Sequence, residues 1–404
     1  MSLDLAFVRT QFPALADGFA YLDNAGGSLV PVMVADRIRE YLLTTSVQTG
    51  ASYAHSARAS ERLTESRRRM ALFVNAARPE EIVFGPSTTV LMQNLARAMV
   101  HQFQPGDEVI VTRFDHESNI GPWLGLEKLG VVVRIWEIGA DFEADLAALD
   151  ALLSRRTKLV AVTHVSNILG TIMPIAEIAW RVHAVGARIV VDGVAYAPHR
   201  AIDVQALDVD YYVFSFYKTY GPHFAMMYGK YDALLELDGL YHYFYGKDKV
   251  PGKLEPGNPN YELAWGAAGI VDYIERLGGE ARGRAAIETA FERIAHHEAV
   301  LGERLLSYLR GRNDTRIIGR RDSDAASRVP TIAFKVDGKD SAALVRQIDD
   351  HAIGIRFGDF HAKRLVEGLG LSGSNGVVRV SAVHYNTIDE IDRLVAALDR
   401  ALGN

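Results

Sequence analysis

Residues 211–223 read YYVFSFYKTYGPH, and this stretch marks both a buried strand and a candidate site. An apolar, aromatic run with strand character stops at a single lysine, Lys218, and a Gly-Pro turn follows. Burial disfavours the charged form of a lysine, so an ordinary ammonium group is costly here. A lysine can avoid that charge by forming an imine with an aldehyde. The alternative is a structural lysine at a strand end, with its ammonium group extended to solvent.

Short apolar runs alternate with helical patterns from about residue 81 to about residue 230. Near-continuous Val and Ile runs separated by helices are typical of a mostly parallel sheet with helices on both faces. We therefore expect an α/β fold, in which ligands lie beyond the carboxyl ends of the strands. The expected strands before Lys218 are residues 81–84, 107–112, 131–136, 157–163 and 187–192.

The pattern changes from about residue 261, where a long helical stretch at 265–309 leads into a smaller unit. Its expected elements are strands at 329–336, 353–357 and 377–381 and a final amphipathic helix at 387–402. This order predicts a large domain at residues 24–260. Residues 1–23 and 261–404 would form a smaller α+β domain.

The composition is that of an ordinary globular protein. The chain has 404 residues, of which 49% are hydrophobic and 23% charged, enough for two or three domains. A net charge of -6 gives no indication of a nucleic-acid partner. The absence of cysteine excludes disulfides, thiolate metal sites and thiol nucleophiles. No signal-peptide pattern and no membrane-spanning run are apparent, so we expect a cytoplasmic protein without a membrane partner.

Polar residues follow four of the expected strands, and they suit one cofactor. Ser87 and Thr88 precede a helical run, where free backbone N–H groups and hydroxyls can bind phosphate. Asp192 closes a Val-rich run, and its carboxylate could pair with a pyridinium nitrogen. The imidazole of His116 could stack on a pyridine ring or move protons. The amide of Asn167 could donate to a phenolic oxygen.

Each of these residues also has an ordinary structural explanation. Ser and Thr are common helix N-caps, a loop histidine is often merely exposed, and Asn and Asp stabilise turns. Their order along the chain, each at a strand end with Lys218 last, favours a shared site. An aldehyde, a pyridine ring, a phenolic oxygen and a phosphate together describe pyridoxal 5′-phosphate.

Five stretches resemble the motifs of one family, the class V, fold-type I pyridoxal-phosphate enzymes, and within it the cysteine desulfurase and selenocysteine lyase branch. The resemblance covers nearly the whole chain. The stretches are residues 21–27 (YLDNAGG, similar to YLDNAA), 115–123 (DHESNIGPW, to EHHANIVPW), 166–175 (SNILGTIMPI, to SNVLGTINPI), 192–199 (DGVAYAPH, to DGAQAVPH) and 215–222 (SFYKTYGP, to SGHKLYGP).

The resemblance implies a role for each residue of the cofactor site. Lys218 would be the Schiff-base lysine and the proton shuttle, and Asp192 would pair with the pyridine nitrogen. His116 would stack on the ring, and Asn167 would contact the ring oxygen. The hydroxyl groups expected at the phosphate are those of Ser87, Thr88 and Ser215.

The resemblance also implies a homodimer with its active site at the subunit boundary and an amino acid as substrate. Residues 255–260 (EPGNPN) are similar to a family loop, EAGTPN, that reaches the phosphate of the partner, and Asn258 stands in place of the threonine. Arg379 would hold the substrate carboxylate, because a guanidinium fork matches a carboxylate bidentately. A surface ion pair is the structural alternative for Arg379.

Three positions depart from the family pattern. Ala195 replaces a glutamine, and Tyr217 replaces the histidine before the lysine. Residues 356–362 (RFGDFHA) align with RTGHHCA, so His361 stands where desulfurases have the cysteine that forms a persulfide. Desulfuration needs a thiolate, and this chain has none. We therefore do not expect cysteine desulfurase activity by the usual mechanism.

The reaction is left open by the sequence. Transamination, epimerisation and β-elimination all begin with removal of an α-proton by Lys218 and need no cysteine. His361 could be an acid or base for the substrate side chain, or a histidine at the rim of the site. The alternatives are a selenocysteine or cysteine-conjugate lyase, and a non-catalytic regulatory dimer that binds pyridoxal phosphate.

Overall fold

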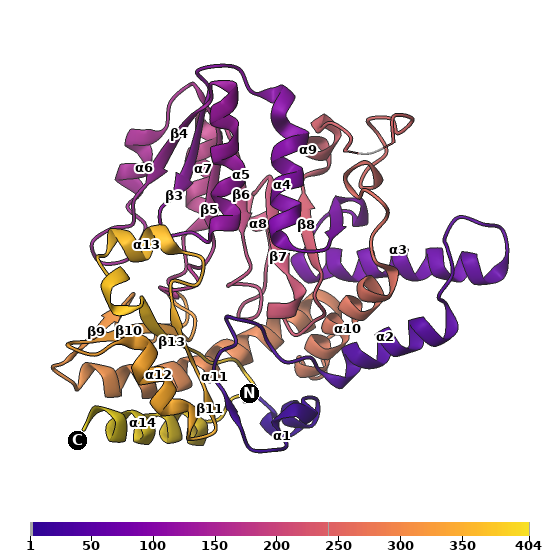
Figure 1. The fold of residues 1–404 in the computed structure, drawn as a ribbon. Coiled ribbons are helices and arrows are strands. Elements are labelled where there is room, and N and C mark those ends of the chain that lie inside the picture. Colours follow the sequence, from indigo (N-terminus) through magenta and orange to yellow (C-terminus); the bar gives the residue numbers. More distant parts are fainter. Residues whose placement is uncertain (1–2, 241, 404) are drawn as a thin grey trace.

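The computed structural model describes residues 3–240 and 242–403, and its largest element is a seven-stranded sheet with the order β2-β8-β7-β6-β5-β3-β4 (Figure 1). The strands are β2 (Ile82–Gly85), β3 (Glu108–Thr112), β4 (Val132–Trp136), β5 (Thr157–Thr163), β6 (Arg188–Asp192), β7 (Tyr211–Ser215) and β8 (Ala225–Gly229). Neighbouring strands from β4 to β7 are parallel, whereas β8 is antiparallel to both β7 and β2. This mostly parallel sheet confirms the expected α/β fold.

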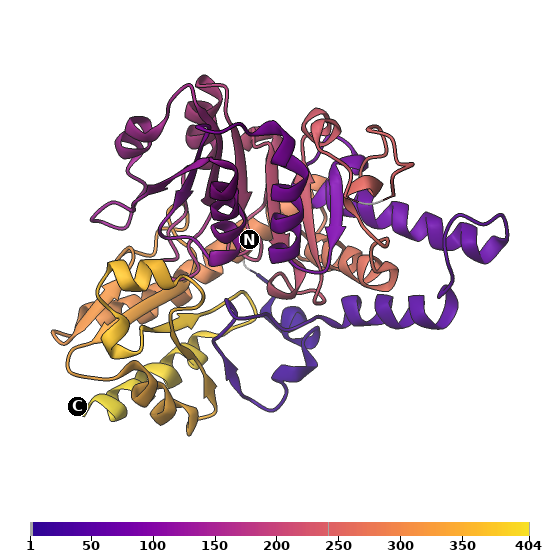
Figure 2. The same cartoon turned by 45° about the horizontal axis from the view of Figure 1, so that its top comes forward.

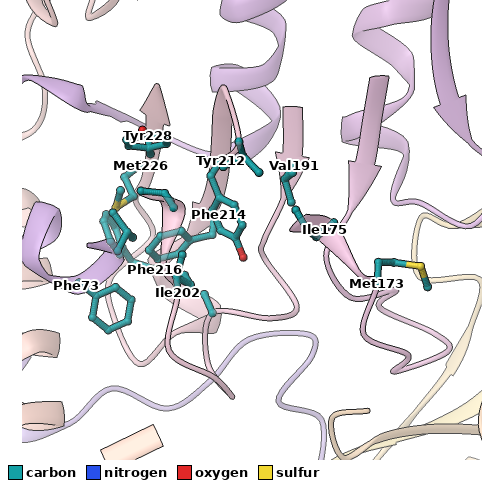
Figure 3. Packing of buried hydrophobic residues seen from close by; sticks show 14 of the residues in the cluster. Phe73, Met173, Ile175, Val191, Ile202, Tyr212, Phe214, Phe216, Met226 and Tyr228 are labelled. Carbon is teal, nitrogen blue, oxygen red and sulfur yellow. The ribbon is translucent and has the colours of Figure 1, made fainter. Parts of the chain in front are cut away.

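Both faces of the sheet are buried, which explains why its strands read as continuous apolar runs. Successive side chains point to opposite faces. Val191 and Phe214 join Phe73 in one core (Figure 3), whereas Val190 and Val213 belong to a second core. The first core is covered by α3 (Ala54–Val74), α7 (Ile175–Ala184), α8 (Val204–Leu207), α10 (Tyr261–Leu277) and α11 (Gly283–Arg310). The second is covered by α4 (Thr88–Met99), α5 (Gly121–Leu124) and α9 (Tyr231–Glu236).

A smaller unit from the C-terminal part lies beside the large sheet (Figure 2). Its antiparallel sheet has the order β12-β13-β10-β9. These strands are β9 (Thr315–Ile318), β10 (Thr331–Val336), β12 (Arg356–Gly358) and β13 (Val377–Ser381), with α12 (Ser341–Asp349) and α14 (Ile388–Leu402) packed beside them. The strand expected at 353–357 is interrupted at Ile355. Its first part, β11 (Ile353–Gly354), pairs with β1 (Ala20–Tyr21) near the N-terminus instead.

The long helical stretch expected at 265–309 is present as two helices, α10 and α11. The chain turns at Gly278 and Gly279. A Cβ on Gly278 would lie 2.4 Å from the carbonyl oxygen of Ala286, and Gly279 has a φ of +77°. Only glycine fits both positions easily.

Helix α10 packs against α2 (Val32–Thr44) and α3, which project from the body of the molecule in both views (Figures 1 and 2). The remaining α-helices of the described residues are α1 (Leu5–Thr10), α6 (Leu146–Leu152) and α13 (Lys363–Gly368). Within the described ranges, no helix has the length and apolar character needed to cross a membrane. The boundary of the two domains remains a prediction.

Candidate active site

One pocket lies at the carboxyl ends of β2, β3, β5, β6 and β7, with about 490 Å³ of empty space. Strand β2 contributes to the same edge because the antiparallel β8 lies between it and β7. Of the predicted site residues, those that line the pocket are Ser87, Thr88, His116, Asn167, Asp192, Ser215 and Lys218.

Lys218 lies at the end of a single 3-10 turn, η6 (Phe216–Lys218), directly after β7. The turn is tight because the backbone N–H groups of Thr219 and Gly221 both donate to the carbonyl oxygen of Phe216, at 2.7 and 2.8 Å. A Cβ on Gly221 would lie 2.8 Å from the side chain of Phe216, so this turn favours glycine at position 221. The turn directs Lys218 into the pocket.

The electrostatics of the pocket depend on a lysine and a buried carboxylate. Burial and the nearby charge of Arg379 lower the pKa of Lys218 to about 8, although two carboxylates oppose this shift. Burial raises the pKa of Asp192 to about 6, and the Val194 N–H, which donates to its Oδ1 at 2.9 Å, opposes that rise. The amine is thus easier to deprotonate, and the carboxyl easier to protonate, than either would be in water.

Asp115 is a second buried carboxyl group close to Asp192. It accepts hydrogen bonds from the side chain of Asn119 at 2.7 Å and from the backbone N–H of His116 at 2.9 Å. Burial raises its pKa, and the charge of Asp192 raises it further. Repulsion between the two groups therefore favours a proton on one of them.

The contacts of His116 assign its protonation. The backbone N–H of Ser118 donates to His116 Nδ1 at 3.1 Å, and the Ser118 hydroxyl lies 2.6 Å from the same atom. A ring nitrogen that accepts a hydrogen bond carries a lone pair, so the proton of the neutral ring lies on Nε2. Burial, with positive charges nearby, lowers the pKa of His116 to about 3. The ring is therefore a neutral surface suited to stacking.

The N-terminus of α4 forms the opposite end of the pocket. The Ser87 hydroxyl caps the helix by accepting the N–H of Val90 at 3.2 Å. The hydroxyls of Thr88 and Ser215 lie 2.7 Å apart, and the N–H of Thr88 donates to Ser215 Oγ at 3.3 Å. This cluster joins two strand ends at a helix N-terminus, an arrangement suited to a phosphate group.

Asn167 connects the pocket to the smaller unit. Its Nδ2 donates to the carbonyl oxygen of Phe360 at 2.9 Å, which uses one of the two amide hydrogens. Its Oδ1 is buried and has no hydrogen-bond partner among the described residues. A buried polar atom without a partner is costly, so a ligand that supplies a donor would stabilise this side of the pocket.

Arg379 is not part of the pocket lining and is not at the surface, since it is only 2% exposed. It pairs with Asp23 at 3.2 Å and donates to the carbonyl oxygen of Asn167 at 3.1 Å. Its guanidinium carbon lies 3.7 Å from the centre of the Phe360 ring, and within residues 3–240 and 242–403 its Nε has no hydrogen-bond partner. Arg356, opposite Arg379 in the β12–β13 pair, contacts Asp23 at 2.7 Å. Two guanidinium groups thus share one carboxylate.

The other two predicted site residues also lie outside the lining. The exposed ring of His361 comes close to His116, with 5.3 Å between ring centres. Asn258 lines a separate cavity with Phe84 and His223, and its φ of 65° is left-handed. Within one chain, Asn258 therefore does not reach the phosphate end.

Two of the departures from the family pattern line the pocket. Ala195 leaves space where a longer side chain is usual. Tyr217 stacks on His223 at 5.0 Å, and Lys218 Nζ lies 5.6 Å from the centre of its ring. Burial and the charge of Asp192 raise the pKa of Tyr217, so its phenol stays neutral.

The residues present fit pyridoxal phosphate. An amine of lowered pKa, a buried carboxylate and a helix N-terminus with hydroxyls all line one pocket, and a flat neutral imidazole forms part of its wall. Lys218 would hold the aldehyde carbon, and Asp192 would face the ring nitrogen. Thr88 and Ser215 would bind the phosphate.

Sequence reasoning missed several residues that shape the site. Asp23 and Asp115 lie within the quoted motifs, but a single carboxylate in a motif does not reveal which arginine or carboxyl group it will meet. Ser118 stands where the family motif has alanine, and this substitution was the available signal. Phe360 could not be found from sequence, because its contact with Arg379 joins a loop to a strand.

Sequence comparison finds related proteins over nearly the whole chain. The sequence model of the family described as aminotransferase class-V matches residues 20–394. An aminotransferase-like protein of Gibberella zeae is 44% identical, over 99% of both chains. A cysteine desulfurase-like protein of Aspergillus flavus is 34% identical over 98% of this chain and 90% of its own. A cysteine desulfurase of Dickeya dadantii is 35% identical over 97% of this chain and 95% of its own.

Solved structures of related proteins have the same fold as this chain. A cysteine desulfurase from Escherichia coli, in an S-sulfonic acid form, has a TM-score of 0.87 and is 28% identical, over 100% of this chain and 99% of its own. The apo cysteine desulfurase of Thermococcus onnurineus has a TM-score of 0.89 and is 28% identical, over 99% of this chain and 98% of its own. The expected architecture is therefore present over the whole described chain.

Proposed function

The chain belongs to the class V aminotransferase family of pyridoxal-phosphate enzymes, and on that premise we propose that it transforms an amino acid through Lys218 without a persulfide. One observation carries the second half of this proposal. The sequence contains no cysteine, and the resemblance to desulfurases assigns His361 to the position of their persulfide-forming residue. An imidazole cannot form a persulfide with the substrate sulfur. Removal of the α-proton, in contrast, needs no cysteine thiolate.

When bound, the cofactor withdraws electrons from the substrate α-carbon. In our proposal, the Asp192 carboxylate faces the ring nitrogen and keeps it protonated, and the neutral His116 ring stacks on the cofactor. Asn167 supports the ring oxygen, while Ser87, Thr88 and Ser215 hold the phosphate. The amine of Lys218 first holds the cofactor and, once released by the substrate, accepts the α-proton at Nζ.

The lowered pKa of Lys218 leads to a prediction about the apoprotein. At pH 7 a pKa of about 8 leaves about one tenth of the amine neutral, against about one in three thousand for an unperturbed lysine. We expect the rate of cofactor capture, followed by absorbance, to rise with pH and level off above about pH 8. A free lysine derivative measured in parallel should continue to rise beyond pH 10. Capture that follows the free lysine would contradict the assigned amine.

Arg379 is proposed to bind the substrate carboxylate. Its two partners, Asp23 and the carbonyl oxygen of Asn167, leave Nε free, and burial strengthens any charge pairing. Because Asp23 also pairs with Arg356, a substrate carboxylate could displace it from Arg379 without leaving it unpaired. This exchange would couple substrate binding to a shift of the β12–β13 pair.

The reaction that follows α-proton removal is proposed to be transamination, epimerisation or β-elimination. His361 supports a step at the substrate side chain, because its ring faces His116 at the rim of the site. A selenocysteine or cysteine-conjugate lyase is the second candidate, favoured by the desulfurase-like relatives. A non-catalytic regulatory dimer is the third, motivated by Ala195 and Tyr217, but the lowered pKa of Lys218 in the pocket favours catalysis.

The decisive experiment is an amino-acid screen of the purified protein with and without an α-keto acid acceptor. Keto-acid-dependent product indicates transamination, and pyruvate without an acceptor indicates β-elimination. From L-cysteine we expect no alanine and no protein-bound sulfur. The His361→Cys variant is the matched control, since it alone could form a persulfide. Alanine released from L-cysteine by the wild type would overturn the proposal.

We also propose that the protein works as a homodimer, with Asn258 reaching the phosphate of a second subunit. This assignment is supported by the separate cavity that Asn258 lines and by its left-handed backbone. A cytoplasmic location and the absence of a nucleic-acid partner are proposed from the sequence alone. Light scattering of the full chain tests the dimer.

A further inference from the structure

Residues 358–364, called the rim loop here, contact the segments that follow β3 and β5 of the large sheet. The backbone N–H of Glu117 donates to the carbonyl oxygen of His361 at 2.8 Å. Asn167 donates to the carbonyl oxygen of Phe360 at 2.9 Å. Arg364, in the first turn of α13, donates from Nε and Nη2 to the two carboxylate oxygens of Glu117, at 3.1 and 3.0 Å. One side-chain pair and two carbonyl groups thus hold the loop.

The backbone of the rim loop needs such restraint. Phe360 and His361 have φ values of 52° and 60°, and Gly358 has a φ of 133°. Two consecutive non-glycine residues in the left-handed region are unfavourable and persist only when surrounding contacts enforce them. The Asp359 carboxylate accepts the N–H of His361 at 3.0 Å, which supports the turn locally. The stacking of Arg379 on the Phe360 ring and the contacts with Glu117 and Asn167 restrain it further.

The consequence of this docking is the position of one imidazole. The His361 and His116 rings lie 5.3 Å apart and are inclined by 50°. Both residues flank the same contact, because Glu117 follows His116 in sequence and bonds to His361. Glu117 and Arg364 therefore act at the point where His361 enters the site from the other domain.

We propose that Glu117 and Arg364 are positioning residues, which clamp the rim loop and hold the His361 imidazole beside His116. This inference rests on the proposed function, in which His361 serves the substrate side chain. The clamp is a bidentate ion pair between half-exposed groups. Such a pair contributes modestly, so it biases the loop between docked and released states and does not lock it. A rim loop that can be released from its docked state would allow the substrate to enter the site past the rim.

The clamp is tested by hydrogen–deuterium exchange of the full-length holoprotein. In Glu117→Gln we expect deuterium uptake in peptides covering residues 358–364 to rise about threefold, consistent with a modest ion pair. The matched control is Glu367→Gln, which removes the Lys363–Glu367 pair within α13, 3.8 Å long, and should leave uptake unchanged. The charge-reversed double variant, Glu117→Arg with Arg364→Glu, should restore protection.

A second measurement reports position and not general stability. In protein with labelled histidines, cross-relaxation between the His116 and His361 ring protons should be present in wild type and in the charge-reversed variant. It should be weakened in Glu117→Gln, in proportion to the smaller docked population. Unchanged uptake in Glu117→Gln, or an equal rise in Glu367→Gln, overturns the clamp. Neither measurement uses turnover or cofactor capture, so failure here is distinct from failure of the proposed function.

Discussion

The Lys218→Ala variant is expected to lose covalent attachment of the cofactor and at least about a thousandfold in turnover. Both losses have one cause, because the same Nζ holds the cofactor and accepts the α-proton. The fold should survive, since Lys218 forms part of a pocket wall and donates none of the hydrogen bonds that shape its turn. Borohydride reduction followed by mass spectrometry of the peptide containing residue 218 measures attachment, and product formation from the best screened amino acid measures turnover.

Lys218→Arg is the matched control, since it keeps a cation in the same turn but cannot form an imine. We expect it to behave like the alanine variant in both assays. Residual turnover within tenfold of wild type in either variant would mean that another base removes the α-proton. A large drop in thermal stability in both would instead indicate a structural lysine, the alternative left open by the sequence.

The strands that could be predicted from sequence are those whose character is local. Residues 157–163 and 377–381 were expected as strands and form β5 and β13 with those bounds, because Val-rich runs buried on both faces need no partner to be recognised. β8, with the sequence AMMYG, has no β-branched residue and was not expected. It is a strand because β2 and β7 pair with it on either side. Tertiary pairing overrides propensity at that position.

The candidate site divides in a similar way. Residues directly after the strands, such as Asp192 and Lys218, could be predicted, since the carboxyl ends of parallel strands converge on one edge. The contacts of Arg379 with Asp23 and Phe360 could not, because they join the N-terminal segment, a strand and a loop. Their geometry depends on how the two domains meet, and the strained backbone of Phe360 follows from that meeting and not from its sequence.

Asp192→Asn is expected to lower turnover about a thousandfold while making the apoprotein more stable. The carboxylate matters for activity because a protonated pyridine nitrogen needs a buried anion, and breaking such a pair costs about 3–5 kcal/mol. Without cofactor, burial of the same carboxylate in its charged form lowers the stability of the folded chain. Its pKa is about 6 in the folded chain against 3.8 for the unperturbed group, so the folded state binds this proton more tightly. Stability therefore falls as pH rises from about 4 to about 6, and the full cost remains above that range.

The size of that cost follows from the shift of about two pH units, each worth about 1.4 kcal/mol, which gives about 3 kcal/mol at neutral pH. Asn cannot ionise and still accepts the N–H of Val194, so Asp192→Asn should raise the Tm of the apoprotein at pH 7.5 but not at pH 4. Asp210→Asn is the control. Asp210 is also buried, but it bonds to His183 and Ile189 away from the pocket, so its loss should lower Tm and spare turnover. A carboxylate that is buried to pair with the cofactor should destabilise the folded apoprotein. An Asp192→Asn apoprotein less stable than wild type at pH 7.5 would therefore mean that Asp192 is a structural cap.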